Sequence, residues 1–206
     1  MRPAIVLIGV ASSLALVTAA SAQAARPHFI IVRGTIASFQ GSTLMVKTSG
    51  GSTTDVELGA KTNVGALKKI ALSDIKPGSY IGTAAVPGQD TSLRALEVMV
   101  FPPSMRGVGE GHSPYDLGGP KSSMTNGTVG KVTATPAGRQ ITVSYKTGSQ
   151  TVTVAPTTPV VTPTAADRGD LKPGAVVFVL GAPGTAGGKV DARLITVEKN
   201  GVVPPM

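Results

Sequence analysis

The chain has 206 residues, contains neither cysteine nor tryptophan, and carries a formal net charge of +8 at pH 7. The absence of cysteine excludes disulfide bonds, so the burial of apolar side chains must hold the fold together. The basic residues are dispersed, with no run longer than Lys68-Lys69, which is unlike the clustered basic surface of a nucleic-acid-binding protein. We therefore expect no nucleic-acid partner, while a diffuse positive field would attract anionic polymers weakly.

Residues 1–22 have the pattern of a signal peptide. Met1-Arg2 gives a short positive start, Ala4 to Ala20 is an apolar run, and Ala20-Ser21-Ala22 has the small residues that a signal peptidase reads. Ala22-Gln23-Ala24 offers the same pattern a second time. The run is short and rich in alanine, and no later segment is long enough to span a bilayer. The sequence predicts cleavage near Ala22-Gln23 and a periplasmic or secreted protein with no stable membrane span afterwards.

The next residues alternate in the manner of short β-strands. In the first half of the chain these strands are Phe29 to Ile36, Ser42 to Val46, Thr54 to Leu58, Tyr80 to Val86 and Leu93 to Phe101. Between the third and fourth strands, Ala66 to Leu72 has a composition that favours about two helical turns.

A Lys-Pro-Gly step precedes the most apolar strand. Proline fixes φ and glycine tolerates positive φ, so Lys76-Pro77-Gly78 predicts a type II turn. Asp74, just before this turn, is explained as a capping side chain. Asp170, Pro173 and Gly174 repeat the same pattern in the second half.

This recurrence belongs to a repeat of the whole first half. Gly59 to Gly88 lies over Ala155 to Gly184 without a gap, at an offset of 96 residues. Five short strands with one irregular or helical segment in each copy predict an all-β protein of two tandem small OB-like Greek-key β-barrels. A small β-sandwich is the structural alternative. The predicted boundaries are 26–103 for the first barrel, 104–123 for a Pro/Gly-rich linker, 124–200 for the second barrel and 201–206 for a C-terminal tail.

Several segments carry a resemblance to a known group of proteins. They are Ala71 to Gly82, Arg94 to Val98, Met105 to Leu117, Met124 to Asn126 and Gly201 to Met206. These segments resemble exported alphaproteobacterial proteins that are built from tandem OB-like domains of unknown function. Such sequences have been given the name metal ABC transporter permease, but a permease needs several membrane spans. The resemblance implies the fold and the export, and no established activity. Tyr115 stands where this group usually has tryptophan, and Met99 stands where histidine is common, which removes a metal ligand.

The linker mixes charged, aromatic and apolar side chains that a simple spacer would not need. Arg106, His112, Tyr115 and Leu117 predict a recognition segment for an envelope protein or an anionic envelope polymer. The alternative is that Tyr115 and Leu117 pin the linker to the surface of a barrel. Exposed strand edges offer a second route to a partner, by β-augmentation.

A metal site is the second hypothesis for the linker. Glu110, His112 and Asp116 fall within seven residues of one another, and an imidazole with two carboxylates suits Zn²⁺ or another divalent ion. The alternative is an exposed polar loop, because this spacing matches no closed structural zinc site.

Catalysis finds little support in the composition. The chain has only His28 and His112, no cysteine, and no serine in a Gly-x-Ser-x-Gly motif. We therefore expect no enzymatic activity and no cofactor. The sequence favours a binding or structural module of the bacterial cell envelope, and the alternative is a periplasmic protein that binds a divalent metal.

Overall fold

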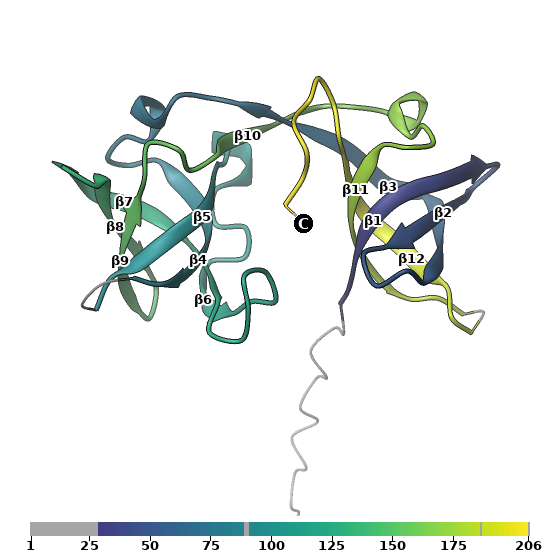
Figure 1. Cartoon of the computed structure of the whole chain (residues 1–206), viewed down its shortest axis with the longest axis horizontal. Helices are drawn as coiled ribbons and strands as arrows, with labels where there is room; N and C mark the ends of the chain where they lie inside the picture. The colour runs from purple at the N-terminus through teal and green to yellow at the C-terminus, as the bar shows by residue number, and fades with distance from the viewer. Residues whose placement is uncertain (1–28, 89–90, 186, 206) are drawn as a thin grey trace, which may run out of the picture.

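The computed structural model describes residues 29–88, 91–185 and 187–205, so the predicted signal peptide lies outside the described residues. This part of the chain is all-β, as the sequence predicts (Figure 1). Its strands are β1 (Ile30–Gln40), β2 (Thr43–Thr48), β3 (Thr53–Lys69), β4 (Tyr80–Pro87), β5 (Leu93–Val100), β6 (Gly111–Pro114), β7 (Ser123–Thr135), β8 (Gly138–Tyr145), β9 (Gly148–Val154), β10 (Val160–Ala165), β11 (Val176–Pro183) and β12 (Val190–Val197). Short 3-10 helices span Leu72–Asp74, Pro103–Met105 and Arg168–Asp170. None of the helices in the described ranges has the length and apolar character that a membrane crossing requires.

The strands close into two five-stranded rings, which form the two lobes of Figure 1. In the first ring, here called barrel 1, β1 pairs with β2, β2 with β3, β3 in parallel with β12, β12 with β11, and β11 with β1. In the second ring, barrel 2, the corresponding circuit runs through β7, β8, β9, β5 and β4. The parallel pairing of Leu93 with Val152 and of Arg94 with Thr153 closes barrel 2.

The barrels do not coincide with the predicted boundaries of 26–103 and 124–200. Barrel 2 is built from one continuous stretch, β4 to β9, whereas barrel 1 combines β1, β2 and β3 with β11 and β12 from the end of the chain. Barrel 2 is therefore inserted between the third and fourth strands of barrel 1. The two halves of the sequence repeat contribute to both barrels.

A ribbon of two strands causes this arrangement. The last residues of β3, Gly65 to Lys69, leave barrel 1 and pair antiparallel with Val161 to Ala165 of β10. Both segments run between the lobes at the top of Figure 1, and each carries the chain from one barrel to the other. The predicted helical turns at Ala66 to Leu72 are wrong, because Ala66 to Lys69 are extended and pair with β10, and a 3-10 helix begins at Leu72.

The two Lys-Pro-Gly turns form as predicted. Ser79 N donates to Lys76 O at 3.0 Å, and Gly78 has a φ of 83°. In the second copy, Gly174 has a φ of 89°. Each turn also reaches the first strand of the other repeat, because Gly78 N donates to Val129 O and Gly174 N donates to Ile36 O.

The carboxylates before these turns are caps, which agrees with the sequence interpretation. Asp74 accepts a hydrogen bond from Ala71 N at 2.9 Å, and Asp170 accepts one from Asp167 N at 3.0 Å. Asp170 also forms an ion pair with Lys199 at 2.8 Å.

Each barrel has a core of aliphatic side chains drawn from both halves of the chain. The core of barrel 1 includes Ile36, Leu44 and Val56 from the first half and Leu171, Val179 and Ile195 from the second. The core of barrel 2 includes Ile75, Ile81 and Val98 from the first half and Val129, Ile141 and Val152 from the second. Neither half can bury its apolar residues without the other in this arrangement.

Candidate functional site

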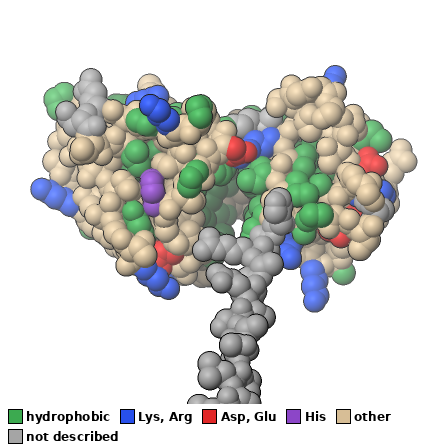
Figure 2. All heavy atoms as spheres, turned by 90° about the horizontal axis from the view of Figure 1, so that it is seen from below, with side chains coloured by type: hydrophobic (Ala, Val, Ile, Leu, Met, Phe, Trp, Pro, Cys, Tyr) green, Lys and Arg blue, Asp and Glu red, His purple; other side chains and the backbone are tan. Residues whose placement is uncertain are grey.

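A cavity of about 320 Å³ lies between the two barrels. Figure 2 shows the hollow from below, with hydrophobic side chains on both of its sides. Barrel 1, barrel 2, the connecting ribbon, the linker and the C-terminal tail all contribute to the wall. The lining residues are Ile31, Leu67, Gly82, Ala84, Glu97, Met99, Phe101, Tyr115, Met124, Asn126, Phe178, Leu180, Leu194, Thr196 and Pro205. This volume and this mainly apolar lining are typical of a site for a small molecule.

Three neighbouring strands of barrel 2 form the floor of the cavity. In the register of β7, β4 and β5, Met124, Ala84 and Glu97 lie side by side. The next row of the same face holds Asn126, Gly82 and Met99. The two central positions have the smallest side chains, so the floor is depressed along β4 and the longer side chains of β5 and β7 rise on both sides.

Close contacts make glycine necessary at the centre of this floor. A Cβ atom at Gly82 would lie 2.6 Å from Asn126 Oδ1 and 3.0 Å from the ring of Phe101. The missing side chain therefore lets the amide of Asn126 lie over the strand. A larger residue at position 82 would displace part of the wall.

Barrel 1 supplies the opposite wall through β11 and β12. On β11, Val177 and Val179 point into the barrel core, while Phe178 and Leu180 face the cavity. Alternate side chains of a strand point to opposite faces, and here both faces are covered. This explains why Val176 to Leu180 reads as a continuous apolar run instead of an alternating one.

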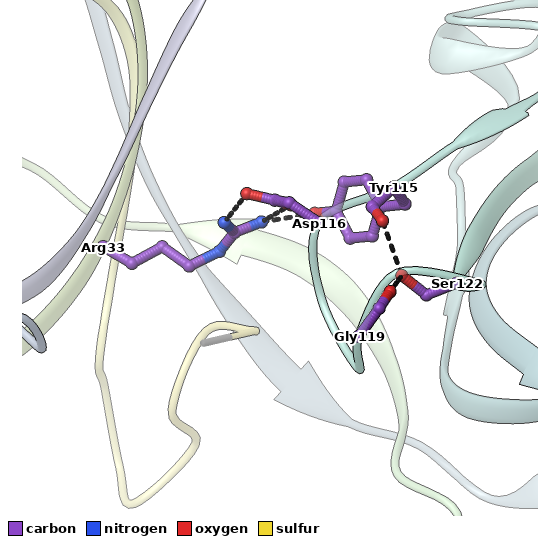
Figure 3. Close-up of polar contacts among 5 residues, drawn as sticks. All are labelled: Arg33, Tyr115, Asp116, Gly119 and Ser122. Atoms are coloured by element: carbon purple, nitrogen blue, oxygen red, sulfur yellow. Dashed lines mark hydrogen bonds and ion pairs between the residues drawn. The ribbon is translucent and has the colours of Figure 1, made fainter.

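The linker closes one side of the cavity and is tied to barrel 1 by Arg33 (Figure 3). Arg33 Nη1 donates to Asp116 Oδ2 at 2.6 Å, and Nη2 donates to Asp116 Oδ1 at 3.0 Å and to Tyr115 Oη at 2.9 Å. The guanidinium also lies against the rings of Tyr115 and Phe178, at 5.4 and 5.2 Å from their centroids. A planar, forked cation suits this combination of a bidentate carboxylate and two rings.

The linker holds Tyr115 in place through its own turn. Tyr115 N donates to Ser122 O at 3.0 Å, and Ser122 Oγ lies 2.5 Å from Tyr115 O and 2.7 Å from Gly119 O. Figure 3 shows the two contacts of Ser122 Oγ beside the Arg33 pair. Hydrogen bonding to Arg33 lowers the pKa of the Asp116 carboxyl group, and burial raises the pKa of the Tyr115 hydroxyl group.

Glu97 is the one acidic side chain among the described residues that line the cavity. Burial raises its pKa to about 7, because an apolar environment disfavours the ionised carboxylate. The carboxyl group therefore changes charge near neutral pH. An ionisable group with a shifted pKa in an apolar cavity is a marker of functional sites.

The structure places the residues of the predicted recognition segment at separate points. Arg106 donates to Gly78 O at 2.6 Å and lies over the ring of Tyr80, on barrel 2. His112 Nδ1 lies 2.8 Å from Thr125 Oγ1, and its ring stacks on that of Tyr145. Leu117 is half-buried, and Tyr115 lines the cavity. Most of this segment is thus fixed to the barrels, as the pinning alternative states for Tyr115.

The predicted metal ligands are not brought together. Asp116 pairs with Arg33, Glu110 accepts a hydrogen bond from Lys146 N at 3.0 Å, and His112 contacts Thr125. No cluster of three or more His, Cys, Asp or Glu side chains suited to a metal occurs within residues 29–88, 91–185 and 187–205. The spacing in sequence fails as a guide because only His112 lies on β6, which pairs with β7, while Glu110 and Asp116 lie on either side of this strand and contact other partners.

Glu97 and Asn126 are the site residues that the sequence interpretation missed. A signal was present for Glu97, which is an acidic residue inside the apolar strand Leu93 to Val100. Asn126 gave no comparable signal, because its place in the wall depends on the pairing of β7 with β4. In comparisons with known proteins, no family model, no curated protein and no solved structure matches the chain.

Proposed function

We propose that this protein is a non-enzymatic binding protein of the bacterial cell envelope, and that the cavity between its barrels holds a small, largely apolar molecule. The observation that carries the proposal is the cavity itself, about 320 Å³ in volume and walled by both barrels, the linker and the tail. Its placement in the envelope rests on the signal-peptide pattern of residues 1–22.

The chemistry of the wall favours binding over catalysis. Among the described lining residues, the ionisable side chains are those of Glu97 and Tyr115, and the other members are mostly aliphatic or aromatic. The Tyr115 hydroxyl group is engaged by Arg33. A single carboxyl group facing apolar walls suits ligand orientation, whereas nucleophilic or acid–base catalysis uses a nucleophile beside a positioned base.

The fold supports the same proposal. We propose that each barrel is an OB-like Greek-key barrel, in which the strands follow the order first, second, third, fifth and fourth, with the third and fifth parallel. The ring of barrel 1 is β1-β2-β3-β12-β11, with β3 and β12 parallel. The ring of barrel 2 is β7-β8-β9-β5-β4, with β9 and β5 parallel. In this interpretation barrel 2 is an OB-like barrel whose chain starts at the fourth strand. The insertion places one face of each barrel against the other and creates the cavity at the seam.

The test is binding of N-phenyl-1-naphthylamine, an uncharged fluorescent probe, to the chain without residues 1–22. The chain has no tryptophan, so Met99→Trp both fills the cavity and reports on it. Met45→Trp is the matched control, because Met45 lies outside the cavity and is 39 % exposed on β2. We expect the unmodified chain and Met45→Trp to bind the probe, and Met99→Trp to bind it at least about tenfold more weakly.

Two results would overturn the proposal. One is the absence of probe binding to the unmodified chain, and the other is equal binding by the Met99→Trp and Met45→Trp variants. Circular dichroism and thermal unfolding of both variants establish that each retains the fold.

A further inference from the structure

Glu97 lines the cavity, and its carboxyl group has no hydrogen-bond donor in the part of the chain that the structure describes. The main-chain oxygen of Glu97 accepts a hydrogen bond from Thr83 Oγ1 at 2.9 Å, but no described residue donates to its carboxylate. The guanidinium group of Arg33 is engaged by Asp116 and Tyr115. A buried carboxylate is costly unless a proton or a cation neutralises it.

A second acceptor in the same wall also lacks a donor. Asn126 Oδ1 is buried and has no hydrogen-bond partner among the described residues. The Asn126 Nδ2 group donates to Val108 O at 3.2 Å, which fixes the amide with Oδ1 over Gly82 at the floor of the cavity. A buried acceptor without a donor carries a free-energy cost that a bound N–H group would remove.

The remaining walls suit an organic cation. Phe101, Tyr115 and Phe178 line the cavity, and the faces of aromatic rings attract positive charge, as the position of Arg33 over the rings of Tyr115 and Phe178 illustrates. Leu180, Leu194 and Met124 provide aliphatic surface for an apolar body. Two acceptors without a donor among the described residues, the ring of Phe101 and aliphatic walls therefore point to one ligand chemistry.

We propose that the cavity selects a small apolar amine in its protonated form, with the ammonium group paired to Glu97 and the hydrocarbon body between the barrels. This inference rests on the proposed binding function and specifies its ligand class. Asn126 Oδ1 accepts a hydrogen bond from the ligand. The cation replaces the proton that Glu97 otherwise takes up.

The test compares three ligands of equal chain length: octylamine, 1-octanol and octanoate, each below its critical micelle concentration. Their affinities are measured at pH 7.5 by displacement of N-phenyl-1-naphthylamine from the chain without residues 1–22. We expect octylamine to bind at least about tenfold more tightly than 1-octanol, and octanoate to bind most weakly. In Glu97→Gln the advantage of octylamine over 1-octanol disappears, while the affinity for 1-octanol stays unchanged.

The control variant is Glu57→Gln, which removes an acidic charge of barrel 1 that pairs with Lys189 and lies outside this cavity. It should keep the full preference for octylamine. Equal binding of the three ligands, or an unchanged preference in Glu97→Gln, would refute the role of Glu97 and leave the apolar binding function standing. Failure of the probe itself to bind would instead refute the binding function.

Discussion

At the scale of single residues, Glu97 connects the cavity to the stability of the fold. Its pKa lies near 7 in the folded protein because burial disfavours the charge. Below its unfolded pKa of about 4.5 the group is protonated in both states and costs nothing. Between pH 4.5 and about 7 the unfolded chain loses this proton while the folded protein keeps it, so stability falls across this range and levels off above pH 7.

We predict that Glu97→Gln stabilises the ligand-free protein at pH 8 and has little effect at pH 4.5. The gain at pH 8 should be on the order of 3 kcal/mol, which follows from a raised pKa of about 7. Urea unfolding of both proteins between pH 4.5 and pH 8 measures this difference. A stability difference that does not change with pH would mean that Glu97 titrates normally.

For Glu57→Gln we predict a change in stability of the opposite sign, because the pKa of Glu57 is shifted in the opposite direction. The pKa of Glu57 is lowered, first by its hydrogen bond from Lys189. Its contribution to stability is therefore present above the unfolded pKa and is lost as the pH falls through the folded pKa. This variant should be destabilised at pH 8, and the difference should shrink toward acidic pH.

At the scale of elements, the sequence predicts strands and turns well because their signals are local. The strand predicted at Leu93 to Phe101 spans Leu93–Val100 in the structure. The Lys-Pro-Gly turns depend on two adjacent residues whose backbone preferences agree. The prediction of helical turns at Ala66 to Leu72 failed because the extended form of Ala66 to Lys69 depends on pairing with β10, which lies far away in the sequence.

We predict that Gly78→Ala and Gly174→Ala each lower the free energy of unfolding by about 1 kcal/mol, because a side chain is strained at positive φ. Both residues have φ above 80° with open space around the added Cβ, so strain alone acts. Gly59→Ala is the control, since a Cβ there also meets open space and its φ is not in the positive region. Denaturant unfolding of the three variants measures the effect. Equal stability of all three would contradict the turn assignment.

At the scale of the whole molecule, the repeat predicts two barrels but cannot say which strands share one. The sequence does not distinguish pairing of a fourth strand with the first strand of its own copy from pairing with the first strand of the other copy, and the structure has the second. Tyr80 pairs with Thr128, and the matching position Val176 pairs with Thr35. The choice is made by the ribbon of β3 and β10, whose geometry the sequence does not reveal. The cavity follows from that choice, which is why its wall could not be predicted either.

The insertion predicts which fragments fold. A fragment of residues 70–160 contains all of barrel 2 and its core, so it should fold alone as a monomer. A fragment of residues 26–103, the predicted first domain, lacks β11, which pairs with β1, and β7, which pairs with β4, so it should not form a closed monomeric barrel. Size-exclusion chromatography and amide NMR spectra of the two fragments test this. If the fragment 26–103 folds as a monomer and the fragment 70–160 is unfolded, the insertion of barrel 2 between the third and fourth strands of barrel 1 is contradicted.

Barrel 2 is inserted into the sequence of barrel 1, and this insertion also sets the order in which the two barrels can be completed during synthesis. β1, β2 and β3 leave the ribosome first. However, Ile30 of β1 cannot pair until Gly181 of β11 has been made, and Val56 of β3 cannot pair with β12 until Val190 has been made. Barrel 2 has all of its strands long before that point, because it ends at β9. Until β11 and β12 arrive, the nascent chain exposes two unpaired strand edges, which are prone to aggregation. The first strands to be made are therefore the last to be closed, and the final strand β12 completes the molecule.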